Sequence, residues 1–476
     1  MLSHIRELAL QDYVVGKRHK FMINSTPNIV QKGSDVYVYG NFGYGFKGGY
    51  ALKVNNLAKI SLDVSNDTKF ASLDKDFVHF ELTPSGTFNL PGTSTTVSYG
   101  SDLVGKMNYA PSEIKQDGNV YLVYSSGFDA TDSSGVSQNG LFVVDLFNKD
   151  NMCNDLALYK RPCIIKEIPL DKNYHGQYQD AISDPWNLGR KNAIGPNSII
   201  ELSPNTNKYD AIYVGDYFGN LWKLDIAGEP IASWGNTKKP KVIFNAVDSN
   251  EVAQPITGMI GAAHYDGGVY LVFGTGSFVY DIDNKEVSER YNTHQLIYAM
   301  KDMTSGFNVS SLDTIKRCTG ENQNGCLRMT KMSSGKENIR TYIPAGTPDY
   351  GWYADLESYN GSNDQTGAGE RVYTDPLVLG TTAYITTNIP NTKDPCVGAG
   401  VSAIFEADLT SGTFKELQKF DALAKSTTAT IHNGKVVIHV PLDSVSSKND
   451  AGGDPQSYTK ELAYPGVKHS SRLHIY

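Results

Sequence analysis

One short pattern returns along the whole chain: an apolar strand, a turn containing glycine, and a second strand with an aliphatic–(Asp or Lys)–aliphatic ending. The clearest copy is YVGDYFGNLWKLDI at 213–226. Runs of Val, Ile, Tyr and Phe separated by Gly and Asn are typical of β-hairpins. The other copies lie at 36–54, 120–146, 269–302, 341–356 and 383–409, and the closing residues are Lys53, Asp145, Asp225, Asp302, Asp355 and Asp408.

Prolines precede most of these hairpins. Each stands just before a short apolar run, where its missing N–H does not interrupt a ladder, so each predicts the start of a strand. A further hairpin is predicted at 428–440, around the type I′ turn signal Asn433-Gly434. The prolines are Pro27, Pro111, Pro196, Pro255 and Pro376.

A unit of about 50 to 90 residues with three or four strands, repeated six or seven times, is typical of a β-propeller. A pair of β-sandwiches would also contain many short strands, but it would not explain the return of the same hairpin with the same closing residue. The sequence therefore predicts an all-β, quinoprotein-like propeller of about seven blades with long loop insertions. It is expected to form one domain over 1–476, with a short amphipathic helix within 1–20 as lead-in.

The net charge argues against nucleic-acid binding, and the hydropathy argues against a membrane-spanning helix. A net charge of −8 argues against sequence-independent binding of DNA or RNA, which needs a basic surface. No apolar run approaches the roughly 20 residues that a membrane-spanning helix needs. The first 21 residues carry charges throughout and lack the apolar core of a secretory signal.

The five cysteines form two close pairs and one single residue. Cys318 and Cys326 bound a polar loop that suits a disulfide, and Cys153 and Cys163 are a weaker second pair. Neither spacing is that of a zinc site. Disulfides would indicate an oxidising compartment, and Cys396 is expected to be free.

The sequence motifs that could indicate an enzyme lack the neighbouring residues or elements that each would need. Gly43, Gly45 and Gly48 satisfy G-x-G-x-x-G, but a strand follows them instead of the helix that a dinucleotide site needs. Propeller quinoprotein dehydrogenases resemble one another in a vicinal Cys-Cys pair, which this sequence lacks. The interpretation is a non-enzymatic protein, with such a dehydrogenase as the alternative.

A calcium loop is the best candidate site. The segment ELSPNTNKYD at 201–210 offers oxygen atoms at alternating positions, as a hard cation requires. Only two of these groups carry charge, and the usual glycine is missing, so a solvated polar turn is the competing interpretation. A second segment, with Asp281, Asp283, Asn284 and Glu286, is weaker because Lys285 interrupts it. The candidate ligands are Glu201, Ser203, Asn205, the carbonyl of Asn207, and Asp210.

Within the hairpin at 213–226, Asp216 is interpreted as a residue that satisfies the backbone of the turn. Trp222 and Trp352 occupy what look like equivalent places in two hairpins. Both are interpreted as residues that fill the space between blades, because large aromatic side chains supply much buried area. Ligand stacking is the alternative for both.

These segments, taken in order, resemble the C-terminal propeller of the PilY family, the PilC-type proteins of the type IV pilus tip. The matching stretches cover nearly the whole chain. They are STPNIV with YGNFGYGFKGGYALKV, YVGDYFGNLWKLDI, QPITG with VYLVFGTGSFV, GWYADL with GERVYTDPLVL, and TTNIPNTKDPCVGAGVSAIFEADLTSGTF.

The resemblance implies a surface protein that promotes pilus assembly, counters retraction, and supports adhesion and twitching motility. It implies minor pilins of the tip, and a host-cell surface, as partners. It further implies a calcium loop at 201–210, although this segment has fewer acidic groups than the family's loop. The family's N-terminal adhesion module and first hairpin are absent, so the chain is expected to be a fragment or a short member. A structural module of a larger surface protein is the remaining alternative.

Overall fold

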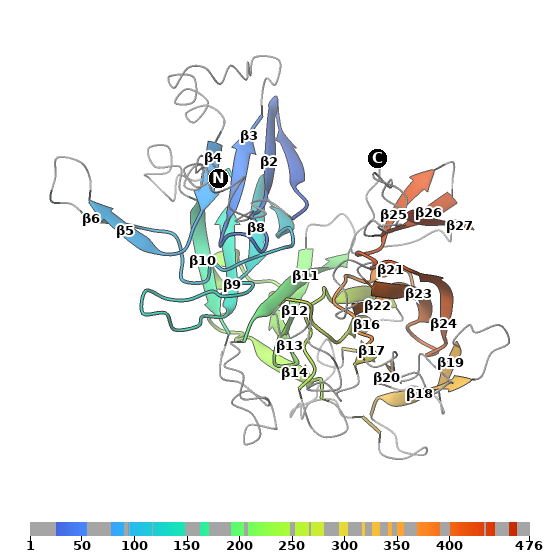
Figure 1. Cartoon of the computed structure of the whole chain (residues 1–476). Helices are drawn as coiled ribbons and strands as arrows, with labels where there is room; N and C mark the ends of the chain where they lie inside the picture. Colours follow the sequence, from blue (N-terminus) through green and yellow to red (C-terminus); the bar gives the residue numbers. More distant parts are fainter. Residues whose placement is uncertain are drawn as a thin grey trace, which may run out of the picture. The chain divides into compact units, whose positions relative to one another are not determined.

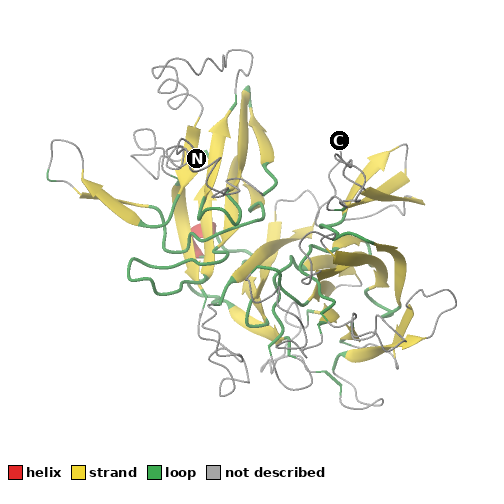
Figure 2. Ribbon diagram, viewed as in Figure 1, coloured by secondary structure: helices red, strands yellow, loops and turns green. Residues whose placement is uncertain are grey.

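The computed structural model describes the chain in segments, and its hydrogen-bonded strands account for most of them (Figures 1 and 2). Among these residues the single helix is the 3-10 turn η3, Ile231–Ser233. The predicted helix within 1–20 and the turn at Asn433-Gly434 lie outside the described residues. The described residues are 25–54, 78–89, 94, 96–116, 118–147, 162–170, 192–203, 208–247, 253–265, 268–279, 295–302, 317–318, 326–333, 341–344, 350–356, 369–390, 400–432, 435–442 and 457–463.

Two compact units divide the chain. Unit 1 consists of residues 1–173, 191–197 and 229–237, and unit 2 consists of residues 174–190, 198–228 and 238–476. Strand β11 begins in unit 1 and continues into unit 2. The expectation of a single domain over 1–476 stays a prediction.

Unit 1 holds two four-stranded antiparallel sheets and a two-stranded ribbon, β5–β6. The first sheet has the order β1-β2-β3-β4 and the second β10-β9-β8-β7. Their strands are β1 Asn28–Lys32, β2 Asp35–Asn41, β3 Gly49–Lys53, β4 Val78–Leu82, β5 Gly86–Asn89, β6 Thr96–Tyr99, β7 Ser112–Gln116, β8 Asn119–Ser125, β9 Gly140–Asp145 and β10 Cys163–Pro169.

The strands from β11 onward form a four-stranded sheet (β11-β12-β13-β14), a ten-stranded sheet and a three-stranded sheet (β25-β26-β27). The ten-stranded sheet contains two antiparallel groups of four, β15-β16-β17-β20 and β24-β23-β22-β21, joined through β18 and β19. The bounds are β11 Ile194–Ser203, β12 Lys208–Asp216, β13 Asn220–Asp225, β14 Lys241–Asn245, β15 Gly261–Tyr265, β16 Gly268–Gly274, β17 Leu296–Lys301, β18 Arg328–Ser333, β19 Thr341–Pro344, β20 Gly351–Asp355, β21 Leu377–Leu379, β22 Thr382–Pro390, β23 Gly400–Asp408, β24 Phe414–Phe420, β25 Thr428–His432, β26 Lys435–Pro441 and β27 Ser457–Ala463.

Six of the predicted hairpins are confirmed as antiparallel pairs. They are β2–β3, β8–β9, β12–β13, β16–β17, β22–β23 and β25–β26. The all-β prediction is therefore confirmed, with several four-stranded antiparallel sheets.

The hairpin predicted at 341–356 is wrong. Thr341–Pro344 (β19) pairs with β18 and β24, whereas Gly351–Asp355 (β20) pairs antiparallel with β17 and parallel with β18. The reason is that an isolated copy of the hairpin pattern does not specify which strand will pair with it. β20 instead makes its backbone hydrogen bonds as the fourth strand of the group β15-β16-β17-β20.

The strand starts predicted at the prolines are mostly confirmed. Pro27, Pro111 and Pro376 stand one residue before β1, β7 and β21. Pro196 is the third residue of β11, and Pro255 is followed only by an isolated bridge between Ile256 and Gly276, so the prediction fails at Pro255.

Consecutive sheets within each unit pack face to face through shared hydrophobic clusters. In unit 1 one cluster joins the first two sheets, from Tyr39 and Leu82 to Leu122 and Phe142. In unit 2 three clusters join the β11–β14 sheet to the β15-β16-β17-β20 group, that group to β21–β24, and β21–β24 to β25–β27. The apolar residues of each hairpin thus fill the space between neighbouring sheets.

Within each unit, a repeated hydrogen bond connects one sheet to the next one along the chain. A residue near the end of the second strand of a sheet forms a hydrogen bond with a residue just before the first strand of the following sheet. The four bonds are Gly43 N–H to Met107 O (3.0 Å), Ile256 N–H to Asp216 O (2.9 Å), Val372 N–H to Thr275 O (2.8 Å), and Ala424 N–H to Asn388 Oδ1 (2.8 Å).

Candidate functional site

Asp216 closes strand β12 at the centre of the 213–226 hairpin, and its carboxylate is fully buried. The N–H groups of Phe218 and Asn220 donate to Oδ1 at 3.0 and 2.9 Å. Asn220 Nδ2 and Trp222 Nε1 each donate to Oδ2 at 2.8 Å. Because both carboxylate oxygens accept from the hairpin itself, the interpretation of Asp216 as a turn residue is confirmed.

Gly219 makes the tight turn of this hairpin possible. Its φ of 79° lies in the left-handed region, and a Cβ there would stand 2.5 Å from the carbonyl oxygen of Ala246. Only glycine fits this combination of conformation and close approach.

Three of the strand-closing aspartates act in the same way. In each, the carboxylate accepts from the N–H two residues later, which turns the chain out of the sheet. The pairs are Asp145 with Phe147 (3.0 Å), Asp225 with Ala227 (3.2 Å) and Asp408 with Thr410 (2.9 Å). For Asp408, burial alone would raise the pKa, but hydrogen bonds from Ser411 and Thr410 outweigh it and lower the pKa.

Asp302 differs from the other closing residues, and the sequence did not predict its role. It follows β17, is fully buried, and its Oδ2 accepts from Lys223 Nζ at 2.7 Å and from the hydroxyl of Tyr213. Lys223 lies in β13 with only 4% of its side chain exposed. This ion pair connects two neighbouring sheets of unit 2. The sequence feature that could have indicated this buried ion pair is the lysine inside the largely apolar run LWKLDI.

A second polar contact joins the two sheets of unit 1. Tyr39 in β2 donates its hydroxyl hydrogen bond to Glu113 Oε1 in β7. Burial first, and then the negative charge of Glu113, raise the pKa of Tyr39. Both contacts are structural, because each lies between packed sheets.

The two tryptophans do not occupy equivalent places, in contrast to the prediction. Trp222 lies in the inner strand β13 and bonds to Asp216 in its own hairpin. Trp352 lies in β20, is fully buried, and packs against Phe414 of the next four-stranded group with ring centroids 5.9 Å apart. Trp352 therefore fills the space between sheets, as expected.

The predicted calcium loop connects two hydrogen-bonded strands of one sheet. Glu201 and Ser203 belong to the end of β11, and Asp210 belongs to the start of β12. Asn205 and Asn207 lie outside the described residues, as do Asp281, Asp283, Asn284 and Glu286. The half-buried Asp210 accepts through its backbone carbonyl from Ile226 N–H at 2.9 Å.

The calcium assignment stays a prediction. Strand pairing brings the two ends of the segment together, as a compact oxygen-rich loop requires. Among the residues that the structure describes, no group of three or more His, Cys, Asp or Glu could hold a metal ion.

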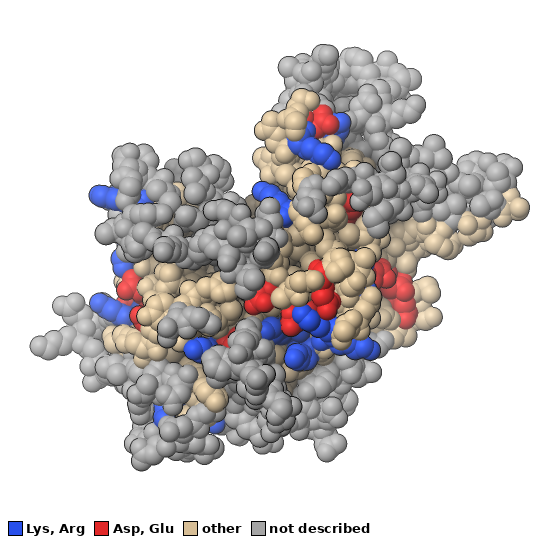
Figure 3. Space-filling view, turned by 180° about the vertical axis from the view of Figure 1, so that it is seen from behind, with Lys and Arg blue, Asp and Glu red and all other residues tan. Residues whose placement is uncertain are grey.

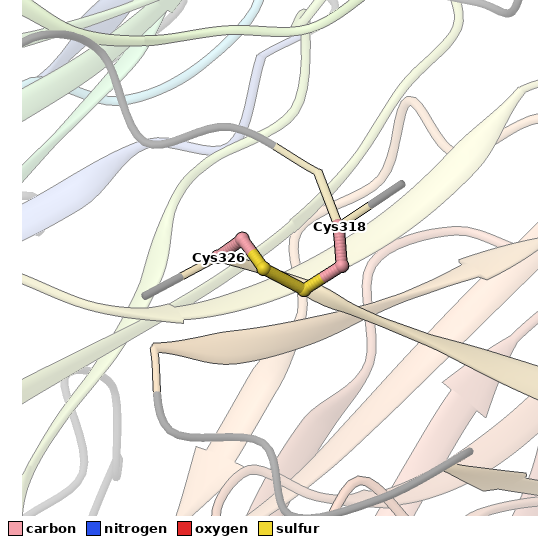
Figure 4. Close-up of a disulfide and its surroundings, with 2 residues drawn as sticks. All are labelled: Cys318 and Cys326. Carbon is pink, nitrogen blue, oxygen red and sulfur yellow. A yellow bond between two sulfur atoms is a disulfide. The ribbon is translucent and has the colours of Figure 1, made fainter. Parts of the chain in front are cut away.

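The disulfide predicted between Cys318 and Cys326 is confirmed, with the sulfur atoms 2.02 Å apart (Figure 4). It closes an eight-residue separation just before β18. Cys163 is also disulfide-bonded. Cys153 and Cys396 lie outside the described residues, so their predicted states stay predictions.

The described charges on one face of the molecule are of both signs. In Figure 3 the described acidic and basic side chains lie interspersed on the face shown. Among the described residues, no helix is long and apolar enough to cross a membrane.

Comparison with known proteins finds distant relatives of this chain. No protein-family profile matches the chain. The type IV pilus biogenesis factor PilY1 homologue of Xylella fastidiosa is 23% identical over 425 residues, which is 87% of this chain. PilY1 of Pseudomonas aeruginosa is 24% identical over 374 residues, or 69% of the chain. The chain is a distant homologue of the PilY1 pilus biogenesis factors.

The match to PilY1 falls on one part of that protein. The crystal structure of the Pseudomonas aeruginosa PilY1 C-terminal domain aligns with a TM-score of 0.55 and 17% identity, over 90% of this chain and 85% of that domain. This alignment confirms the fold predicted from the resemblance at the level of an all-β, multi-sheet C-terminal domain. The chain spans 24% and 30% of the length of the two full-length PilY1 relatives.

Proposed function

We propose that this protein is a non-enzymatic type IV pilus biogenesis factor of the cell surface or pilus tip. There it would promote pilus assembly, counter retraction, and support adhesion and twitching motility. The observation that carries the proposal is the similarity to PilY1 along 87% of the chain.

We further propose that the sheets are the blades of a propeller of about seven. Two regularities within each unit support this arrangement: the shared hydrophobic cluster between consecutive sheets, and the hydrogen bond that links one sheet to the next. Both are expected when four-stranded sheets repeat around an axis. Such a scaffold would present its loops rigidly to partners.

Binding to pilins tests this function directly. The purified chain should bind the purified globular domain of at least one minor pilin of the same organism, with a Kd of about 1 μM or tighter, as expected of an interface of standard size. Biolayer interferometry would measure the affinity. If none of the minor or major pilin domains bound, the proposed function would be wrong.

Calcium binding at 201–210 is a separate proposal, supported by the oxygen-rich segment and by the pairing of β11 with β12. A bound ion stabilises the native state by mass action, by about 2.7 kcal/mol at a concentration one hundred times Kd. We expect millimolar calcium to raise the Tm, and Asp210→Asn to abolish most of that rise. Magnesium serves as the ion control. An equal Tm with calcium and with chelator would exclude the site.

A further inference from the structure

The β18–β19 hairpin is an addition to the repeating architecture of unit 2. The groups β15-β16-β17-β20 and β24-β23-β22-β21 each contain the four strands that the β11–β14 sheet also has, so each is complete without the hairpin. The hairpin nevertheless pairs with the last strand of both groups, β20 on one side and β24 on the other (Figure 1). It therefore joins two sheets that would otherwise end separately.

The strand pairing on both sides of the hairpin is short. Residues 328–330 lie parallel to 352–354, and residues 341–342 lie antiparallel to 414–415. Parallel pairing is slightly less stable per residue than antiparallel pairing, and a two-stranded hairpin alone in water is at best marginally stable. Strand pairing by itself therefore holds the hairpin only weakly to either sheet.

The disulfide between Cys318 and Cys326 lies directly before β18 and fixes the residues that anchor the hairpin (Figure 4). Cys326 is followed by Leu327, which is fully buried in the hydrophobic cluster that contains Tyr353 of β20. The N–H of Cys318 donates to the carbonyl oxygen of Leu327 at 2.9 Å, and the Arg317 guanidinium lies 5.5 Å from the centre of the Tyr353 ring. The disulfide thus holds both anchoring residues, Arg317 and Leu327, against β20 at the same time.

Reduction of the disulfide removes this constraint. A disulfide stabilises the folded chain mainly by restricting the open one, so without it the entropy cost of ordering both cysteine segments falls on the remaining noncovalent contacts. The parts of a protein that open first are those held by few contacts. Because the four strands of each group remain paired when the hairpin opens, the rest of unit 2 can stay folded.

We propose that the β18–β19 hairpin is a redox-controlled clasp. It stays docked on β20 and β24 while Cys318 and Cys326 form a disulfide, and it is released when they are reduced. In the release step a dithiol reductant gives two electrons and two protons to the disulfide, which becomes two thiols, and the reductant becomes a disulfide. Docking reverses this exchange with a disulfide-bonded oxidant.

The clasp makes the joining of the two sheets depend on an oxidising compartment, where such disulfides form and persist. Release exposes the backbone groups of β20 and β24 that pair with the hairpin, and these strands then become open sheet edges. This inference goes beyond the proposed function, because it concerns the docking of the hairpin and not the binding of a pilin.

Hydrogen–deuterium exchange tests the clasp. The double variant Cys318→Ser/Cys326→Ser removes only the disulfide of the clasp. We expect amide exchange in β18 and β19 to be faster by about tenfold or more in this variant than in the oxidised wild-type protein, measured by mass spectrometry of proteolytic peptides. The β12–β13 hairpin should exchange at the wild-type rate. Wild-type protein reduced with dithiothreitol should give the same pattern as the double variant.

The matched control is Cys163→Ser, which removes a disulfide at β10 in unit 1 and should leave the exchange of β18 and β19 unchanged. Equal exchange of β18 and β19 in the double variant and the wild-type protein would overturn the proposal. Faster exchange throughout unit 2, or loss of cooperative unfolding, would also overturn it, because the disulfide would then stabilise the whole unit. A Cys318–Cys326 bond that dithiothreitol cannot reduce in the folded protein would exclude control by redox state.

Discussion

Replacing Lys223 by methionine should lower the free energy of unfolding by about 3–5 kcal/mol, as expected when one partner of a buried ion pair is removed. The variant leaves the Asp302 carboxylate inside the core without the ammonium group that lies 2.7 Å away. Chemical denaturation followed by tryptophan fluorescence would measure the change.

Two further variants test whether the loss of stability comes from the buried ion pair. Lys223→Met combined with Asp302→Leu removes both charges and should recover most of the loss, since apolar replacements of buried pairs are often neutral or better. Lys238→Met breaks a partly exposed pair with Asp225, at 3.2 Å, and should cost less than about 1 kcal/mol. If Lys223→Met lost no more stability than Lys238→Met, the ion pair between the sheets would not be a structural element.

Asp216→Ala should destabilise unit 2 by about 3 kcal/mol or more, because hydrogen bonds to a charged group contribute about 1.5–3 kcal/mol each. It removes the acceptor of four donors in the 213–226 hairpin, among them the buried Trp222 Nε1. Asp216→Asn should have an intermediate effect, since its amide keeps one acceptor but turns an NH₂ group toward donors. Urea denaturation would measure both.

The matched control for Asp216 is Asp225, which closes the same hairpin at a more exposed position. Asp225→Asn should cost less than about 1 kcal/mol, since it weakens one 3.2 Å turn bond and one surface ion pair. A binding or catalytic role for Asp216 would give the opposite pattern. In that case Asp216→Ala would abolish pilin binding while leaving the unfolding curve unchanged.

The local features were predictable because short-range chemistry decides them. The apolar runs on either side of the Gly- and Asn-containing turn indicate the β12–β13 hairpin locally, and Asp216 has its donors within six residues. The disulfide between Cys318 and Cys326 is local in the same sense.

The features that the sequence did not reveal depend on distant partners. β19 and β20 are close in the chain, but they pair with β24 and β17, and no local signal distinguishes those pairings from a hairpin. Lys223 and Asp302 lie far apart in the sequence, so their contact follows only from the order of the sheets. The same limit applies to the candidate loop, because the spacing of its residues predicts only a turn, whereas the structure shows that the strands on either side of it, β11 and β12, are neighbours in one sheet.

The amount of surface pili in a strain that lacks this gene tests the central claim most directly. We predict that deletion abolishes or strongly reduces surface pilin, measured by shearing and by electron microscopy, and that the wild-type gene restores it. Normal numbers of surface pili in the deletion strain, with normal adhesion and twitching, would contradict the account.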